Sequence, residues 1–258
     1  MSNTHMVIGD QHAKPKESLE RFSILGEFAL KYRPDEIIAM GDWADMPSLS
    51  SYDVGKKSFE GRRYNDDIEA CRDALAAFSA PIYAYNRNQS RNRKVQYKPT
   101  MTMLGGNHDE ARINRVIESD PKMEGTISVD DLGYEDFGWE YQPFLMPKNI
   151  DGVLYNHYFI SGIMGRAIGG QNSAKSIINT NMVSSTAGHS HVFDYANRTT
   201  PEGKRIHGLV AGCYFEDTMD YAKSVEHLWW RGIQLCHNVK DGDYDLETFS
   251  MRRLRDIL

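Results

Sequence analysis

Histidine and acidic side chains recur in five short segments of the chain, each next to a run of hydrophobic residues. In chain order the segments read GDQH, GDWAD, GNHDE, YNHYF and GHSH. Mixed imidazole nitrogen and carboxylate or amide oxygen ligands favour Mn²⁺, Fe or Zn²⁺ over Mg²⁺ or Ca²⁺. Divalent ions held by such groups can activate water for attack on a phosphoester. The residues that could take part are Asp10, His12, Asp42, Asp45, Asn107, His108, His157, His189 and His191.

Each segment taken alone has a purely structural explanation. Gly-Asp and Gly-Asn are common turn dipeptides, and a single histidine in a strand is more often a core residue than a ligand. In the first segment, however, Asp10 and His12 are two positions apart, so both side chains lie on one side of an extended chain. The fifth segment has the same spacing. Five such segments, each at the end of a predicted strand, are difficult to attribute to turns alone.

Eight hydrophobic runs predict the strands that would position these segments. They lie at residues 5–9, 36–41, 100–104, 153–158, 184–188, 207–213, 232–239 and 244–251. The first five of these strands carry the polar segments, and in α/β sheets the loops at the carboxyl ends of strands converge on one ligand-binding crevice. The last two strands are joined by Asp241 and Gly242, a dipeptide typical of hairpin turns.

Helices are predicted where hydrophobic residues recur at intervals of three or four. They run from about residue 19 to 32, from about 66 to 78, and from Asp109 to a point before Pro121. Helices alternate with strands in the first half and the second half is rich in strands, which predicts α/β layers with at least one mixed sheet. Residues 46–98 are a long connection for such a unit, and we expect a helical insertion there.

The length and composition favour a single packed domain over residues 1–258. Hydrophobic residues make up 40% of the chain and charged residues 26%, and the formal net charge is −6. This charge argues against a protein that coats duplex nucleic acid, although a local basic groove stays compatible with it. The three cysteines lack the spacing of a zinc site or a disulfide framework. Without a secretory signal or an apolar run of ~20 residues, we expect a cytoplasmic protein with no membrane partner.

In this order the five segments resemble the motifs of the calcineurin-like metallophosphoesterases. That family carries DxH, GDxxD, GNH followed by Asp or Glu, a single histidine, and GHxH. Every motif is present here, between Asp10 and His191. The resemblance extends to the stand-alone enzymes of bacteria and their phages. It implies an α/β fold in which a sandwich of two mixed β-sheets is flanked by α-helices, with a dinuclear metal site at the carboxyl ends of the strands.

The resemblance also implies a role for each polar residue. The ligands would fall into two sets that share one carboxylate. The first set comprises Asp10, His12, Asp42 and His191. The second set comprises Asp42, Asn107, His157 and His189. His108 would not bind metal; it would protonate the leaving oxygen or contact the phosphate, oriented by Asp45.

The predicted insertion contains the most basic part of the chain. No acidic residue occurs from residue 74 to 108, and five Arg and Lys residues cluster within residues 86–98. Three aromatic residues are interleaved with them: Tyr83, Tyr85 and Tyr97. These residues could stack bases beside a groove that follows a phosphate backbone. A solvated helix end and loop explain the same charges equally well.

Together these patterns favour a phosphodiesterase that depends on two divalent metal ions, with Mn²⁺ preferred, and that acts on DNA, RNA or a nucleotide. The second motif continues with Met46 and Pro47, where protein phosphatases of the family have Arg-Gly, which argues against a phosphoprotein substrate. One alternative is a phosphomonoesterase of a small metabolite. Another is a degenerate binding module without catalysis, which the completeness of the motifs disfavours.

Overall fold

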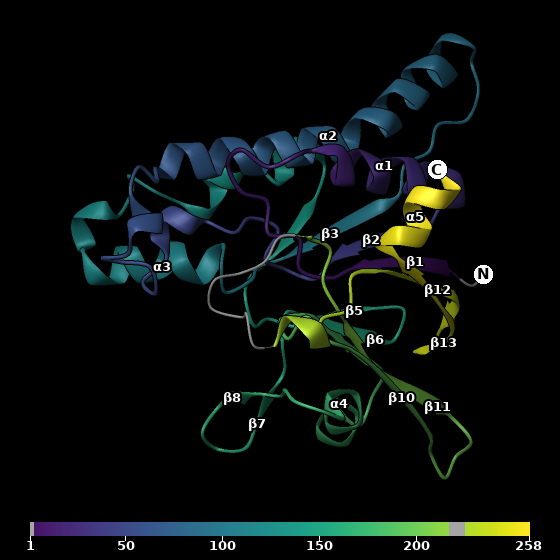
Figure 1. Ribbon diagram of the computed structural model, residues 1–258. Coiled ribbons are helices and arrows are strands. Elements are labelled where there is room, and N and C mark those ends of the chain that lie inside the picture. Colours follow the sequence, from purple (N-terminus) through teal and green to yellow (C-terminus); the bar gives the residue numbers. More distant parts are fainter. Residues whose placement is uncertain (1–2, 217–224) are drawn as a thin grey trace.

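Two mixed β-sheets pack face to face in the computed structural model, which describes residues 3–216 and 225–258 (Figure 1). In order across the six-stranded sheet, the strands are β13 (Asp243–Ser250), β12 (Gly232–Lys240), β1 (Asn3–Ile8), β2 (Glu36–Ala39), β3 (Thr100–Leu104) and β4 (Glu140–Gln142). Strands β1 to β4 run parallel, and β12 and β13 are antiparallel to their neighbours.

The second sheet is shorter and is also mixed. Its strands, in order, are β10 (Phe193–Thr199), β11 (Arg205–Ala211), β9 (Ser185–Ala187), β6 (Val153–Asn156) and β5 (Lys148–Ile150). The three central strands are parallel, while β10 and β5 pair antiparallel at the edges. A separate small hairpin consists of β7 (Ile160–Ser161) and β8 (Arg166–Ala167). The prediction of an α/β fold with mixed sheets is therefore confirmed.

Five α-helices surround the sheets among the described residues (Figure 1). They are α1 (Glu20–Tyr32), α2 (Tyr64–Arg91), α3 (Glu110–Ser119), α4 (Ser173–Asn181) and α5 (Met251–Ile257). Helices α1 and α2 cover the outer face of the six-stranded sheet, and α4 covers the outer face of the other sheet. None of these helices is both long enough and apolar enough to cross a membrane.

The alternation of side chains along the central strands explains why both faces of the first sheet are buried. In β1, Met6 and Ile8 pack toward α1 and α2, while Val7 points into the space between the sheets. Successive residues of a strand point to opposite faces, so a strand buried on both faces is a continuous hydrophobic run. Val7 meets residues such as Tyr155 and Leu209 of the second sheet, which completes the layer between the sheets.

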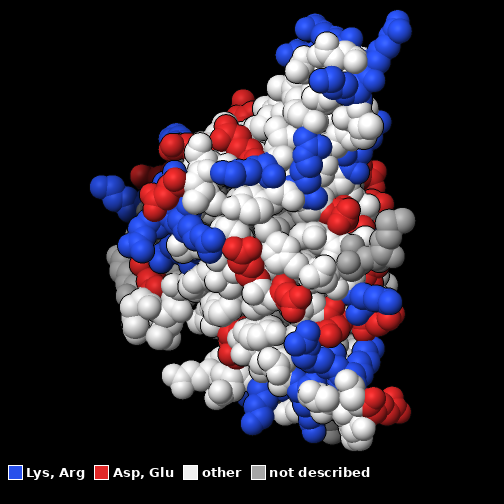
Figure 2. All heavy atoms as spheres, turned by 90° about the vertical axis from the view of Figure 1, so that its right-hand side faces the viewer, with Lys and Arg blue, Asp and Glu red and all other residues white. Residues whose placement is uncertain are grey.

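Helix α2 is much longer than the helix predicted at residues 66–78. It continues through Pro81, which cannot donate a backbone hydrogen bond, and the helix changes direction along its length (Figure 1). Close packing on α1 supports this region, because a Cβ at Gly26 would collide with the carbonyl oxygen of Phe78. The last turns of α2 project beyond the rest of the molecule, and Figure 2 shows Lys and Arg side chains gathered on this projecting end.

Candidate metal centre

The five polar segments follow strands of both sheets and meet at one edge of the sandwich. The segments after β1, β2 and β3 come from the first sheet, and those after β6 and β9 come from the second. Side chains from all five approach one another closely, and most of them are buried. The structure thus brings together all nine residues singled out from the sequence.

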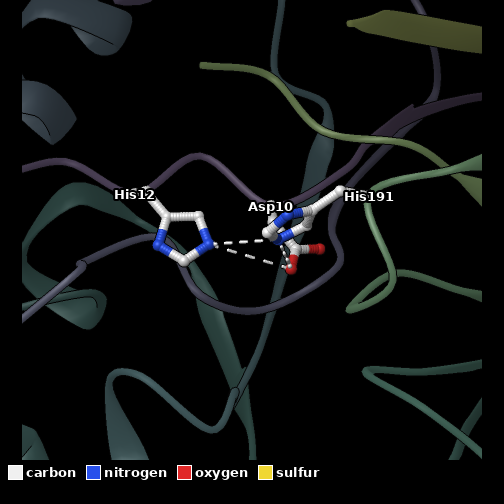
Figure 3. A group of neighbouring side chains, drawn as sticks. All are labelled: Asp10, His12 and His191. Carbon is white, nitrogen blue, oxygen red and sulfur yellow. Dashed lines mark hydrogen bonds and ion pairs between the residues drawn. The ribbon is translucent and has the colours of Figure 1, made fainter. Parts of the chain in front are cut away.

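Three members of the first predicted ligand set lie together in Figure 3: Asp10, His12 and His191. The Oδ2 atom of Asp10 lies 3.1 Å from Nε2 of His191 and 4.0 Å from Nε2 of His12. The two histidine nitrogens are 3.4 Å apart. Nε2 of His12 is also 3.9 Å from Oδ2 of Asp42. Asp10, His12 and His191 are therefore close enough to share one cation, and Asp42 approaches this group beside His12.

The second predicted set lies on the other side of Asp42. Oδ2 of Asp42 is 3.5 Å from Nε2 of His157. Oδ1 of Asn107 lies 2.8 Å from Nε2 of His157 and 2.7 Å from Nδ1 of His189. Because Oδ2 of Asp42 approaches His12 on one side and His157 on the other, this carboxylate is placed to serve both sets.

A third grouping of side chains bears on the predicted role of His108. Potential ligand atoms lie within 4.8 Å of one another in Asp10, His12 and His191, in Asp42, His157 and His189, and also in His12, Asp42 and His108. Each of the first two groups contains three of the four residues of one predicted set. The third shows that His108 is close enough to act as a ligand, so its assignment as a proton donor depends on a test of metal content.

Two of the histidine rings are oriented by a hydrogen bond from the ring nitrogen that points away from the site. Nδ1 of His157 lies 2.8 Å from the carbonyl oxygen of Met40, and Nδ1 of His12 lies 3.0 Å from Oδ1 of Asp45. A proton on Nδ1 that is donated to an oxygen leaves the lone pair of Nε2 directed at the site. Both rings therefore present the nitrogen that the ligand sets require.

The electrostatics of the site suit cations rather than protons. Burial and the charge of nearby His108 lower the pKa of His12 to about 3. Burial and His157 lower the pKa of His189 to about 4. These two imidazoles are therefore neutral at physiological pH, which is the form that binds metal. Burial raises the pKa of Asp42 well above its ordinary value, against the effect of His108. A divalent ion would compensate the charge of this buried carboxylate.

The backbone of the site is strained at four of the predicted ligands. His12, Asp42, His189 and His191 have φ angles of 47°, 52°, 68° and 60°. This left-handed conformation costs a residue with a side chain about 1–2 kcal/mol. Such strain persists where the surrounding structure enforces it, and it concentrates at functional sites. It is a feature independent of the distances, and it favours a binding site over a chance cluster of polar residues.

Glycines of the motifs allow ligands from different segments to approach. A Cβ at Gly106 would collide with Asp42, and one at Gly188 would lie 2.6 Å from Oδ1 of Asp10. At Gly41, where φ is 98°, a Cβ would lie 2.6 Å from Nδ1 of His157. The glycine in each of these motifs therefore makes room for a ligand that another segment supplies.

Asp45 contacts two histidines through the same oxygen. Its Oδ1 lies 2.7 Å from Nδ1 of His108 and 3.0 Å from Nδ1 of His12. Burial alone would raise the pKa of Asp45, but hydrogen bonds from His108 and His12 hold it well below its ordinary value. Asp45 is therefore ionised and orients a predicted ligand as well as the predicted proton donor. The contact with His12 was not anticipated from the sequence.

Replacing Asp45 with asparagine is expected to weaken metal binding and catalysis together. The amide oxygen carries no charge and accepts more weakly from both imidazoles than the carboxylate oxygen does, so His12 would be less well oriented. Loss of a group that supports a metal ligand typically reduces affinity or activity by about 10- to 100-fold. Mn²⁺ titration with parallel rate measurements would check this, with Asp245→Asn on the exposed surface as a control. Reduced activity with unchanged Mn²⁺ affinity would limit the role of Asp45 to His108.

The structure places two further residues at the site, to which the sequence had given no role there. One belongs to the third segment and the other to the helix that follows it. Asp109 is fully buried, and it accepts hydrogen bonds from the backbone of Gly106 at 2.6 Å and of Trp43 at 3.2 Å, so it ties two motif loops together. Arg112 lies one helical turn beyond His108, and its Nη2 is 3.5 Å from Nε2 of that histidine. The spacing of four residues on a helix was the only signal that could have indicated Arg112.

A pocket of about 1130 Å³ opens over these residues. Its floor includes Asp42, Asn107 and His108. Residues between 47 and 67 also line the pocket, and this segment is held by hydrogen bonds such as that from Nη1 of Arg115 to Oγ of Ser51 at 2.9 Å. Pockets for small molecules typically have volumes of about 300–1000 Å³. This pocket exceeds what a phosphate group alone would fill.

Comparisons with known proteins add little to this description. No protein-family model and no curated protein matches the chain. Among solved structures, TT1561 of Thermus thermophilus aligns over 96% of this chain and 99% of its own, with 8% identity and a TM-score of 0.38. A second structure aligns over 97% of this chain and 100% of its own, with 9% identity and a TM-score of 0.37. Both scores are too low to assign a fold family.

Proposed function

We propose that this chain is a phosphodiesterase that depends on two divalent metal ions and acts on nucleic acid or a nucleotide. The main support is the pair of ligand sets that share Asp42 at the floor of the large pocket. The motif resemblance to the calcineurin-like metallophosphoesterases agrees with this proposal. Imidazole, carboxylate and amide donors together suit Mn²⁺ best, with Fe or Zn²⁺ as alternatives.

The chain would hold one ion with Asp10, His12, Asp42 and His191, and the other with Asp42, Asn107, His157 and His189. Bound there, the ions would supply positive charge that activates water and stabilises the phosphoryl oxygens. Protonated on both ring nitrogens, His108 would donate its Nδ1 proton to the ionised Asp45 and its Nε2 proton to the leaving oxygen. The guanidinium of Arg112, beside that ring, would bind a phosphate oxygen in the pocket.

The pocket favours a diester of some size over a small phosphomonoester. Beyond the ligand residues its lining includes cations such as Arg115, acidic residues such as Asp66, and the aromatic residues Tyr52 and Trp229. Tyr52 is 79% exposed, so its ring is available to a ligand. Cationic and aromatic side chains together suit the phosphates and bases of a nucleotide chain.

A direct test compares Mn²⁺-loaded protein on bis(p-nitrophenyl) phosphate, p-nitrophenyl phosphate, and single- and double-stranded DNA. We expect faster hydrolysis of the diester than of the monoester, cleavage of DNA, and loss of all activity after treatment with a chelator. Preference for the monoester with DNA left intact would instead support a phosphatase of small metabolites. Protein that binds two ions and hydrolyses none of these substrates would support the non-catalytic module.

A further inference from the structure

The C-terminal part of α2 extends beyond the core of the protein (Figure 1). Its last buried residue is Ile82, and the helix continues to Arg91 without another buried side chain. Most helical stability in proteins comes from packing of an apolar face, which these last turns lack. We use the name α2 tip for residues 86–98, which include the end of this helix and the chain that returns from it.

Hydrogen bonds and ring contacts hold the α2 tip in a defined conformation. The backbone N–H of Tyr97 donates to Oδ1 of Asn86 at 2.8 Å, and Nδ2 of Asn86 donates to the carbonyl oxygen of Tyr97 at 2.6 Å. The hydroxyl of Tyr97 donates to the carbonyl oxygen of Pro34, and the guanidinium of Arg33 lies 4.6 Å from the ring centre of Tyr85. Tyr85 and Tyr97 are thus engaged within the fold, which disfavours base stacking by them, one of the two interpretations that the sequence allowed.

Five exposed cations of the α2 tip form an unbalanced positive patch in an otherwise acidic chain. They are Arg87, Arg91, Arg93, Lys94 and Lys98. Figure 2 shows Lys and Arg side chains at this end of the molecule. The ion pairs among the described residues involve other cations. The charges of the α2 tip are therefore available to a polyanion.

The α2 tip lies far from the proposed catalytic pocket. Arg63, Asp66 and Asp67 at the start of α2 line that pocket, whereas the cations lie at and beyond its other end. A helix of 28 residues, at a rise of 1.5 Å per residue, is about 42 Å long along its axis, and the bend at Pro81 makes the distance between its two ends somewhat shorter. The basic residues of the α2 tip therefore do not line the pocket over the predicted metal ligands. Any ligand of the α2 tip is bound at a separate site.

We propose that the α2 tip is a second nucleic-acid-binding site, which contacts the phosphate backbone remote from the catalytic pocket. Arginine predominates among its cations, and its uncharged residues are mostly amides, which hydrogen-bond to phosphate and sugar. A membrane-binding helix would need an apolar face, but Val95 is the one large hydrophobic side chain exposed within residues 86–98. Nucleic acid therefore fits this surface better than a lipid bilayer does.

The separation from the pocket determines which substrates would benefit from the second site. At about 3.4 Å per base pair, a duplex of up to about 12 base pairs is needed to reach from the pocket to the α2 tip. The α2 tip should thus increase the affinity for long nucleic acids and leave short ones unaffected. This part of the inference rests on the proposed function, whereas binding at the α2 tip does not.

The binding test uses the triple variant Arg87→Gln, Arg91→Gln and Lys94→Gln. Fluorescence anisotropy of a duplex of about 30 base pairs, over a series of salt concentrations with EDTA present, would give the salt dependence of Kd. Each lost phosphate contact should reduce the slope of log Kd against log salt by about 1, so a reduction of up to about 3 is expected. The control is Lys122→Gln, Lys175→Gln and Lys204→Gln, three exposed lysines whose loss changes the net charge equally.

An unchanged slope in the α2 tip variant, or an equal reduction in the control, would overturn the proposal. So would loss of binding to vesicles rich in phosphatidylserine with DNA affinity unchanged, because it would identify a membrane as the partner. Rates of hydrolysis distinguish a failure of this proposal from a failure of the proposed function. The α2 tip variant should have lower kcat/KM on long duplexes, with wild-type rates on duplexes of about 6 base pairs and on bis(p-nitrophenyl) phosphate. A reduced slope without hydrolysis of any phosphoester would retain the second site and reject the phosphodiesterase.

Discussion

Asp42→Asn is expected to remove both metal ions from the protein at once. Oδ2 of Asp42 faces His12 on one side and His157 on the other, so a single substitution weakens both ligand sets. An amide offers one neutral oxygen where the carboxylate offers two charged ones. Phosphodiesterase activity should fall by more than the 10- to 100-fold typical of residues that only support a ligand. Metal analysis of the purified variant, by inductively coupled plasma mass spectrometry, would measure the effect.

Thermal unfolding of the metal-free proteins provides the control for this variant. Burial raises the pKa of Asp42 in the folded chain, so at a pH above that raised pKa the ionised carboxylate opposes folding. Asparagine removes this unfavourable charge and can still accept the hydrogen bond from the backbone of His108. Metal-free Asp42→Asn should therefore unfold at a temperature no lower than metal-free wild type. A variant that keeps two ions and full activity would exclude Asp42 from the site.

His108→Ala is expected to reduce hydrolysis most strongly when the leaving oxygen is basic. A general acid typically contributes about 10²–10⁴-fold, so a substrate that releases a ribose hydroxyl should lose about that much. Nitrophenolate departs without a proton, and the loss on a nitrophenyl ester should be smaller. Rates on the two kinds of ester, measured with the same protein preparation, would reveal the difference. An equal loss on both would assign His108 to phosphate binding instead.

The metal content of His108→Ala addresses the third group of potential ligands. If His108 donates a proton, two ions should remain bound, because both predicted ligand sets are intact in this variant. His12, Asp42 and His108 are nevertheless close enough to share an ion. Loss of metal in proportion to loss of activity would show that His108 is a ligand and would contradict its assignment as the general acid.

The central strands could be predicted because each one is marked by a hydrophobic run in its own sequence. The buried residues at the carboxyl ends of β1, β2 and β3 are mostly hydrophobic, and a glycine-containing polar motif follows each strand. Short strands such as β4 and β5 consist mainly of polar residues and form only because a partner strand lies beside them. Pairing between distant segments is not visible in the sequence of either one.

The length of α2 and several contacts of the site could not be predicted from the sequence, because they depend on tertiary structure. Pro81 normally ends a helix, but α1 packs closely against this part of α2, and the helix continues. The identities of the site residues followed from motif spacing. The sharing of Asp45 between His12 and His108, and the position of Arg112, required the folded geometry because these residues come from different elements.

The most direct test of a dinuclear metal-dependent hydrolase is a Mn²⁺ titration of chelator-treated wild-type protein. Bound metal per chain and the rate of bis(p-nitrophenyl) phosphate hydrolysis would be measured in the same samples. Because both ligand sets contribute to one site around Asp42, we predict saturation at two ions per chain, with full activity reached only as the second ion binds. Saturation at one ion or none, or hydrolysis that persists without metal, would contradict the account.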